Sequence, residues 1–201
     1  MFVVDDDISV RESLEGLLRS AGWRVETFVS AADFLAYPRT NVPCCLVLDV
    51  SLPDLNGLEL QQRLDDRREL PIVFITGHGD IPMSVRAMKA GAIEFLTKPF
   101  KADALLDAVR GAIERSTAAL SRETELKTLR ESYAALSRRE REVLELVVSG
   151  KLNKQVGGEL GISEITVKAH RGRVMRKMKA GSIADLVKMA GKLSAPPSSR
   201  D

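Results

Sequence analysis

The sequence predicts an α/β domain built on a five-stranded parallel sheet, followed by an all-α domain that contains a helix-turn-helix. Three observations support this prediction. Residues 1–115 alternate short apolar runs with amphipathic helical stretches, which is typical of βα units. Residues 137–193 show helical periodicity alone. The chain has 201 residues, of which 44% are hydrophobic and 29% charged, and this suffices for two small globular domains.

Five βα units can be counted in the first 115 residues. Strands are expected at residues 2–4, 23–28, 45–49, 72–76 and 93–96. Helices are expected near residues 8–21, 30–37, 57–67 and 80–90, and from residue 102 onward. Ser30 and Asp80 stand where N-caps belong, and Gly22 and Gly91 stand where helices end. The local signals therefore agree with the predicted order of elements.

The helical pattern that starts near residue 102 continues past the last βα unit and predicts a long connecting helix. The polar run at residues 121–127 either breaks this helix or forms a solvated face of it. Four short helices follow in residues 137–193, with turns at Gly150, Gly161 and Gly181. Residues 194–201 are rich in proline and serine and are expected to be disordered.

Charge is distributed unevenly along the chain. Residues 1–115 hold 13 Lys/Arg and 18 Asp/Glu, a balance of −5, whereas residues 116–201 hold 17 and 10, a balance of +7. The second part is therefore suited to a polyanionic partner. The adjacent Cys44 and Cys45 are expected to be reduced core thiols, and with only His78 and His170 available a zinc site is not expected. The start MFVVDDD fits no secretory signal and no apolar run could span a bilayer, so we expect a cytoplasmic protein without a membrane partner.

Polar side chains follow four of the five predicted strands. Three carboxylates, residues 5–7, follow the first strand, Asp49 ends the third, Thr76 ends the fourth and Lys98 follows the fifth. Parallel strands bring their carboxyl ends to one edge of the sheet, where ligands of such sheets bind. Several carboxylates at one edge repel one another unless a hard cation lies among them, and Mg²⁺ suits oxygen ligands. The sequence therefore predicts a magnesium site at this edge.

This edge has the parts needed for phosphoryl chemistry. Asp49 lies at the mouth of a buried strand, where its carboxylate could attack phosphorus. Lys98 and Mg²⁺ would neutralise phosphoryl oxygens, and the Thr76 hydroxyl could donate a hydrogen bond to one of them. Each aspartate alone could equally be a turn-former or an N-cap, and His78 is expected to be an ordinary loop residue. The joint placement at strand ends favours the functional interpretation.

The segments VVDDD, LVLDVSLPDLNGLEL and IVFITGHGDIPMSVRAMKAGAIEFLTKPF resemble the receiver domains of two-component response regulators. The resemblance covers residues 1–115 and implies a flavodoxin-like sheet with strand order 2-1-3-4-5. It further implies that Asp49 accepts phosphate from a sensor histidine kinase, with Lys98 beside it. The implied ligands of Mg²⁺, or of Mn²⁺, are Asp5, Asp6, Asp49 and the backbone carbonyl of Ser51. Asp7 would lie outside this ligand set, and Thr76 and Phe95 would form the switch pair that responds to phosphorylation.

The C-terminal part carries a helix-turn-helix pattern over residues 153–179. Within residues 164–179 the formal charge is six positive against one negative, which suits the phosphates of a major groove. The residues expected in the small core are Val156, Leu160, Ile162, Ile165, Val167, Val174 and Met178. Those expected to point outward are Lys168, His170, Arg171, Arg173, Arg176, Lys177 and Lys179. Gly157 and Gly158 are expected to weaken the first helix of the pair.

The segment LSRREREVLELVVSGKLNKQVGGELGISEITVKAHRGRVMRKMK resembles the four-helix DNA-binding domain of the FixJ/NarL, LuxR-type branch of response regulators. The resemblance implies a receiver at residues 1–115, a helical linker at 116–136, a DNA-binding domain at 137–193 and a tail at 194–201. The implied DNA contacts are Lys154 and Thr166 on the backbone, Lys168 nearest the bases, His170 and Arg171.

The leading hypothesis is a transcription regulator and not an enzyme. Phosphorylation at Asp49 would drive formation of a homodimer that binds promoter DNA, with RNA polymerase as a further candidate partner. One alternative is a Mg²⁺-dependent phosphohydrolase that forms an aspartyl-phosphate, but such an enzyme needs a second carboxylate two residues on, where this chain has Ser51. Another alternative is a DNA-binding regulator that works without phosphorylation.

Overall fold

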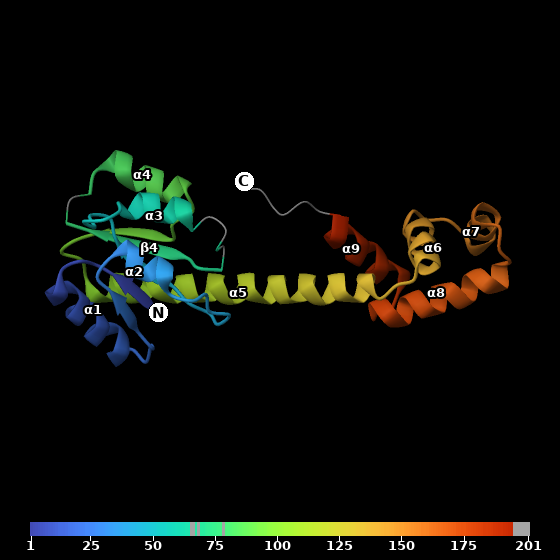
Figure 1. Ribbon diagram of the computed structural model, residues 1–201, viewed down its shortest axis with the longest axis horizontal. Helices are drawn as coiled ribbons and strands as arrows, with labels where there is room; N and C mark the ends of the chain where they lie inside the picture. Colours follow the sequence, from blue (N-terminus) through green and yellow to red (C-terminus); the bar gives the residue numbers. More distant parts are fainter. Residues whose placement is uncertain (65–66, 68, 78, 195–201) are drawn as a thin grey trace. The chain divides into compact units, whose positions relative to one another are not determined.

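The computed structural model describes residues 1–64, 67, 69–77 and 79–194 and divides into two compact units, Met1–Ser121 and the chain from Arg122 onward (Figure 1). His78 and most of the predicted tail lie outside the described residues. The strands are β1 (Phe2–Val4), β2 (Glu26–Phe28), β3 (Leu46–Asp49), β4 (Ile72–Thr76) and β5 (Glu94–Thr97). The helices of the first unit are α1 (Ile8–Ser20), α2 (Ala31–Ala36), α3 (Gly57–Arg63), α4 (Ile81–Lys89) and the first part of α5 (Ala102–Ala134).

The five strands form one parallel sheet in the order β2-β1-β3-β4-β5. Val4 of β1 pairs with Leu48 of β3, and Leu48 pairs with Phe74 of β4. This register places the carboxyl ends of the three central strands side by side. The predicted fold class and strand order are confirmed.

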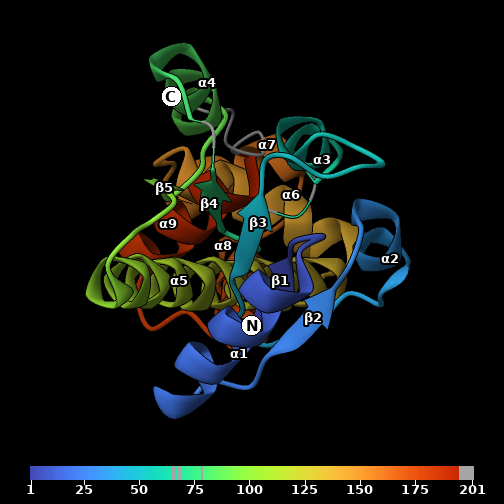
Figure 2. The same cartoon turned by 90° about the vertical axis from the view of Figure 1, so that its left-hand side faces the viewer.

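Helices cover both faces of the sheet (Figure 2). On one face, Leu48 and Phe74 pack with side chains of α2, α3 and α4. On the other face, Val47 and Ile75 pack with α1 and the first turns of α5. The central strands are therefore apolar up to their last residues, Asp49 and Thr76, as in other parallel sheets covered on both sides. The adjacent Cys44 and Cys45 fall on opposite faces, and both are buried free thiols.

Strand β2 is shorter than predicted, because it begins at Glu26 and not at residue 23. The amide of Trp23 donates to the carbonyl of Leu18 at 3.1 Å and so closes the end of α1. This closure uses Gly22 in the left-handed region at φ 89°. The predicted caps are otherwise confirmed, since Ser30 and Asp80 accept amide hydrogen bonds at the starts of α2 and α4.

Helix α5 is continuous from Ala102 to Ala134, so the polar run at residues 121–127 is a solvated part of a helix and not a break. Ser116 of this helix is buried in the first unit, where its hydroxyl accepts from the amide of Cys44 and donates to the carbonyl of Glu69. In the described parts of the chain, no helix is both long and apolar enough to cross a membrane.

The second unit contains the end of α5 and four further helices: α6 (Arg138–Val148), α7 (Asn153–Leu160), α8 (Glu164–Met178) and α9 (Ile183–Ser194). Val167, Val174 and Met178 of α8 are buried against the other helices, as predicted. Ile165 is not in this core, because 80% of its surface is exposed. Two residues before Val167 on a helix, it points about 160° away from the buried face.

Gly157 has a packing role that corrects the expectation of a merely weakened helix. A Cβ at this position would lie 2.7 Å from the carbonyl oxygen of Ile162, so the turn between α7 and α8 requires a residue without a side chain there. A Cβ at Gly158 would meet nothing within 4 Å. Helix α8 ends at Lys179 in the left-handed region at φ 56°, two residues before the predicted turn glycine.

Candidate functional site

Three carboxylates meet at the carboxyl edge of the sheet. Asp5 directly follows β1, Asp49 is the last residue of β3, and one carboxylate oxygen from each of Asp5, Asp6 and Asp49 lies within 4.8 Å of the others. Asp5 and Asp49 are buried, whereas Asp6 is exposed. The predicted convergence is therefore present. An all-oxygen donor set of this charge fits a hard divalent cation.

Lys98 bridges the two buried carboxylates. Its Nζ donates to Oδ2 of Asp5 at 2.7 Å and to Oδ2 of Asp49 at 3.1 Å. Burial raises the pKa of the Asp5 carboxyl, and the hydrogen bond from Lys98 offsets only part of that effect. Burial also opposes the charge of Lys98, but the hydrogen bonds to the two carboxylates outweigh it and raise the pKa of the ammonium. The site thus holds one fixed cation beside three carboxylates and retains a negative charge.

The loop that carries Asp5 and Asp6 is held by its own turn and by α1. Asp7 caps α1 by accepting from the amide of Ser9 at 2.8 Å, and it is not one of the three carboxylates that cluster. Arg11 donates through Nη1 to the carbonyl oxygens of Asp5 at 2.7 Å and Asp6 at 2.9 Å. Sequence reasoning missed Arg11, because contacts with backbone carbonyls follow no residue pattern. Its place one turn into a helix that follows three carboxylates is the only signal the sequence offers.

The loop after β3 is fixed on the other side of Asp49. The amide of Ser51 donates to Oδ1 of Asp49 at 3.2 Å. Asp54 is exposed and accepts from the first amides of α2. Slight desolvation opposes the charge of this carboxyl, but the hydrogen bonds from backbone amides together outweigh it and lower the pKa. A Cβ at Gly57 would lie 2.5 Å from the carbonyl oxygen of Asp49, so α3 starts directly against the backbone of this residue.

Thr76 and Phe95 approach the same glycine. Thr76 ends β4 and is fully buried, while Phe95 of β5 is half-buried with its ring 6.1 Å from that of Phe74. A Cβ at Gly79 would lie 2.9 Å from Cε1 of Phe95 and 3.1 Å from Cγ2 of Thr76. The side chains of Thr76 and Phe95 therefore border the same small space beside Gly79.

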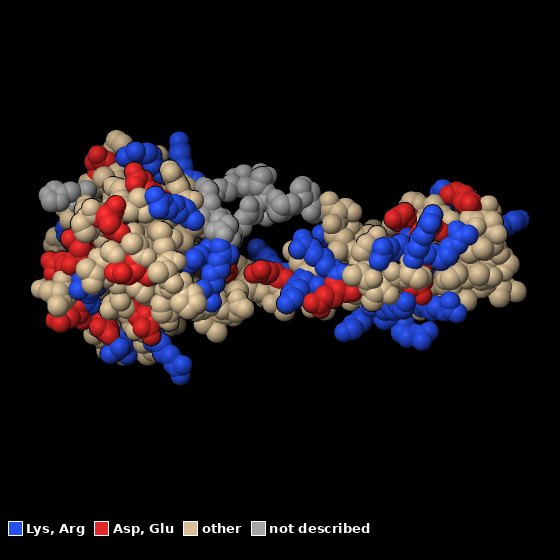
Figure 3. Space-filling view, in the orientation of Figure 1, with Lys and Arg blue, Asp and Glu red and all other residues tan. Residues whose placement is uncertain are grey.

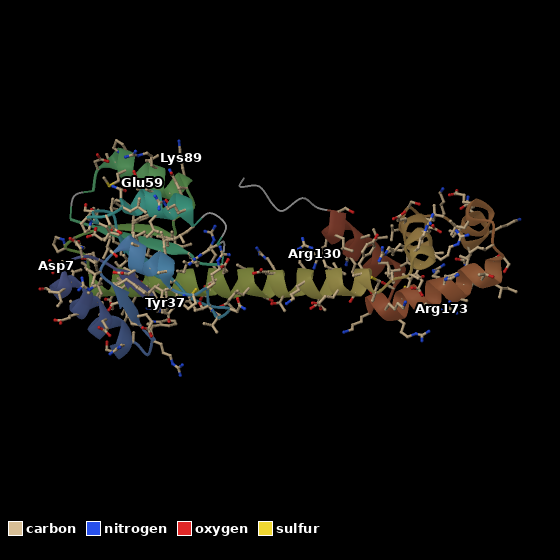
Figure 4. All side chains as sticks on the ribbon, viewed as in Figure 1. Asp7, Tyr37, Glu59, Lys89, Arg130 and Arg173 are labelled. Carbon is tan, nitrogen blue, oxygen red and sulfur yellow. The ribbon has the colours of Figure 1, made fainter. Side chains whose placement is uncertain are left out.

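The second unit presents a basic face on α8. Lys and Arg side chains gather along this helix in Figure 3, and Arg173 projects from its side away from α6 in Figure 4. The exposed cations of this helix and its C-cap are Lys168, Arg173, Arg176, Lys177 and Lys179. The helix starts at the Ser163 N-cap after the left-handed Gly161, and this turn joins it to α7.

The five predicted DNA contacts differ in their surroundings. Lys154 and Thr166 are exposed, and Lys168 is exposed beside Glu164 with 3.4 Å between their charged atoms. His170 and Arg171 are half-buried. Arg171 donates to Oδ1 of Asn153 at 2.9 Å. The structure therefore exposes three of the five side chains and partly covers two.

An ion pair between the exposed Lys177 and the buried Glu140 joins α6 to α8. Glu140 is 3% exposed and accepts from Nζ of Lys177 at 2.7 Å and from the amide of Ser137 at 2.8 Å. Lys177 also donates to the carbonyl of Ala135 at 3.0 Å. The hydrogen bond from Lys177 is the main reason why the pKa of Glu140 falls to about 2. Lys177 was expected simply to point outward, but it fixes the end of α8 to the start of α6.

Comparison with known proteins covers both units. The family model of the response regulator receiver domain matches residues 1–110, and that of the luxR family of bacterial regulatory proteins matches residues 134–190. Nodulation protein W of Bradyrhizobium diazoefficiens is 51% identical over 191 residues, which are 94% of this chain and 84% of that protein. The transcriptional regulatory protein FixJ of Azorhizobium caulinodans is 45% identical over 192 residues, 94% of this chain and 90% of that protein.

A solved structure extends the similarity to the fold. The structure of the response regulator StyR is 52% identical in sequence and matches with a TM-score of 0.83 over 95% of this chain and 97% of that chain.

Proposed function

The chain belongs to the response regulators, as a receiver domain joined to a LuxR-type DNA-binding domain, and on this premise we propose that phosphorylation of Asp49 controls its binding to promoter DNA. Members of this family are transcription regulators and not enzymes, so the phosphohydrolase alternative is set aside. The proposed boundaries are residues 1–115 for the receiver, 116–136 for the linker and 137–193 for the DNA-binding domain.

The observation that carries the proposal is the bridge from Lys98 to Asp5 and Asp49 beside the exposed Asp6. Asp49 would attack the phosphorus of a phosphohistidine on the sensor kinase. The P–N bond breaks, the carboxylate becomes an acyl phosphate, and the leaving histidine takes up a proton. Lys98 exchanges part of its contact with Asp49 for the new phosphoryl oxygens, and Thr76 donates its hydroxyl to one of them.

The residues that would hold a divalent cation are Asp5, Asp6, Asp49 and the backbone carbonyl of Ser51, and we propose Mg²⁺ or Mn²⁺ for this role. When bound, the cation neutralises charge on the phosphoryl oxygens. Arg11 and the Ser51 amide keep the two ligand loops in place around it.

Phosphorylation would act on the second unit through dimerisation. As Thr76 turns toward the phosphoryl group, the ring of Phe95 would move into the space that the threonine leaves, since both side chains border Gly79. This motion alters the surface of α4, β5 and α5. Helix α4 exposes the apolar side chains Ile81 and Val85, which a second copy would cover. The homodimer would then present two α8 helices to two half-sites of promoter DNA.

On DNA, Lys168 would lie nearest the bases, with Lys154 and Thr166 on the backbone and with His170 and Arg171 at the edge of the contact. Asn153 already orients Arg171 toward the start of α7. RNA polymerase bound at the same promoter is a further proposed partner. Because the DNA and the kinase's phosphorylated domain are cytoplasmic, we place the protein in the cytoplasm.

Phosphorylation with acetyl phosphate and Mg²⁺, followed by intact-mass measurement, tests the acceptor. Wild type should gain one acid-stable, base-labile phosphate, and Asp49→Ala should gain none. Asp107→Ala, which removes an exposed carboxylate of α5, should behave as wild type. Labelling of Asp49→Ala to the extent of wild type would refute the assignment.

A further inference from the structure

The outward face of α8 has an unusual chemical pattern. Val167, Val174 and Met178 form its buried stripe. The stripe on the opposite side, at spacings of three and four residues, is exposed throughout and consists of Ile165, Ala169, Gly172 and Arg176. The first three of these residues offer no hydrogen-bond donor or acceptor in their side chains. The side of the helix most distant from the protein core is therefore apolar over its first two turns.

Cations flank this apolar stripe. By helix geometry Lys168 lies on one side of it and Arg173 on the other, and both are exposed. Single exposed apolar residues are ordinary on protein surfaces, but Ile165 is 80% exposed in the middle of a face suited to a polyanion. A lipid surface or an apolar protein groove needs large apolar side chains to bury, and Ala169 and Gly172 offer little apolar area. DNA offers phosphates on both sides of a groove that contains methyl groups.

Packing within the protein does not require the small residues of the stripe. A Cβ at Gly172 would meet nothing within 4 Å, so the glycine is not demanded by a neighbour in the same chain. Short side chains at Ala169 and Gly172 allow the helix backbone to come close to whatever lies against this face. In a recognition helix it is the N-terminal residues that reach the base edges, and Ile165 is the second residue of α8.

We infer that Ile165 is a specificity-determining residue that recognises a thymine through its C5-methyl group in the major groove. The inference rests on the proposed function, and it adds apolar base recognition to the phosphate and base contacts of the cations. Thymine is the one standard base with a methyl group in this groove. Ile165 covers that group when Ala169 and Gly172 let α8 approach the floor of the groove.

The test begins with full-length wild type activated by beryllium fluoride and Mg²⁺, used to select binding sites from random duplex DNA. Each thymine of the selected site is then replaced, one position at a time, by deoxyuridine, which removes only the methyl group. Wild type should lose affinity about fourfold at one thymine in each half-site, since burial of one methyl group changes a dissociation constant by about this factor. Failure to select any site would count against the proposed function and is thus distinguishable from failure of the inference.

The variant Ile165→Ala is then measured on the same thymine and deoxyuridine sites. This variant removes an exposed side chain and inserts a better helix former, so it should fold as wild type does. It should bind the thymine site more weakly and should not distinguish thymine from deoxyuridine at that position. Leu152→Ala is the matched control, because Leu152 is 71% exposed in the same unit but lies outside α8, and it should retain the methyl discrimination.

Two results would overturn the inference. One is a wild-type protein that binds the deoxyuridine sites as tightly as the thymine site at every position. The other is an Ile165→Ala variant that loses the same factor as wild type on removal of each methyl group, which would assign the contact to another side chain.

Discussion

The ion pair between Glu140 and Lys177 should determine much of the stability of the second unit. Glu140 is buried and accepts hydrogen bonds from Lys177 and from the Ser137 amide. Glu140→Gln keeps the shape of the side chain and an acceptor for Ser137, but it leaves the Lys177 ammonium without its counter-charge. The variant therefore isolates the charge interaction from the capping hydrogen bond.

The expected magnitude follows from the pKa. The pKa of Glu140 is about 2, against an ordinary value of 4.5, and one pH unit between folded and unfolded pKa values corresponds to about 1.4 kcal/mol, so the upper bound is about 3 kcal/mol. The Lys177 side chain is 40% exposed, so solvent screens the pair, and about 2 kcal/mol is expected at pH 7. Because the folded pKa is depressed, this stabilisation is complete above pH 4.5 and is lost as pH falls toward 2.

Hydrogen exchange measured by mass spectrometry resolves the two units separately. Peptides from residues 134–194 of Glu140→Gln should exchange about thirtyfold faster than in wild type at pH 7, while peptides from residues 1–110 should be unchanged. The ratio should shrink as pH falls below 4.5. Glu142→Gln, which removes a carboxylate paired with Arg138 and Arg139 at the surface, should exchange nearly as wild type does. Equal exchange of Glu140→Gln and wild type at pH 7, or a ratio that does not change with pH, would refute the reasoning.

Three further predictions concern neighbouring parts of the structure. In thermal unfolding, Gly158→Ala should stabilise the protein by about 1 kcal/mol, whereas Gly157→Ala should destabilise it, because only the second variant adds a Cβ that clashes with the carbonyl oxygen of Ile162. Equal changes in stability for the two variants would contradict this. In calorimetric titration, Arg11→Ala should bind Mg²⁺ about tenfold more weakly than wild type, because the carbonyl oxygens of Asp5 and Asp6 lose the hydrogen bonds from the Arg11 guanidinium. Arg19→Ala on the same helix should bind Mg²⁺ as wild type does. Lys98→Ala should bind Mg²⁺ at least as tightly as wild type but should lose most of its phosphorylation by acetyl phosphate, and unchanged phosphorylation would remove Lys98 from the proposed role.

The acidic cluster was predictable because its geometry follows from topology. Parallel strands end at one edge, so Asp5, Asp49 and Lys98 had to meet once the strands were located correctly. The contact of Arg11 with two carbonyl oxygens was not predictable in this way, since the backbone of a loop has no residue pattern. Strand β2 was predicted too long, because the amide of Trp23 closes a helix end instead of joining the sheet.

The second unit also contains features that the sequence pattern predicts and others that it does not. The periodicity of α8 locates Val167, Val174 and Met178 in the core. The prediction that Ile165 joins them is wrong, because the same periodicity places Ile165 on the opposite side of the helix. The Ser137 and Glu140 spacing is typical of a capping box. The ion-pair partner of Glu140, Lys177, lies 37 residues further along the chain, and only the folded structure brings these two side chains together.

The central claim is that phosphorylation at Asp49 switches the protein to a DNA-binding dimer. The most direct test is the molecular mass in solution with Mg²⁺, with and without beryllium trifluoride, for wild type and for Asp49→Ala. The account predicts that the phosphate analogue doubles the mass of wild type and leaves the variant monomeric. If neither protein responds, or if both respond alike, regulation does not run through Asp49, and the phosphorylation-independent alternative replaces the account.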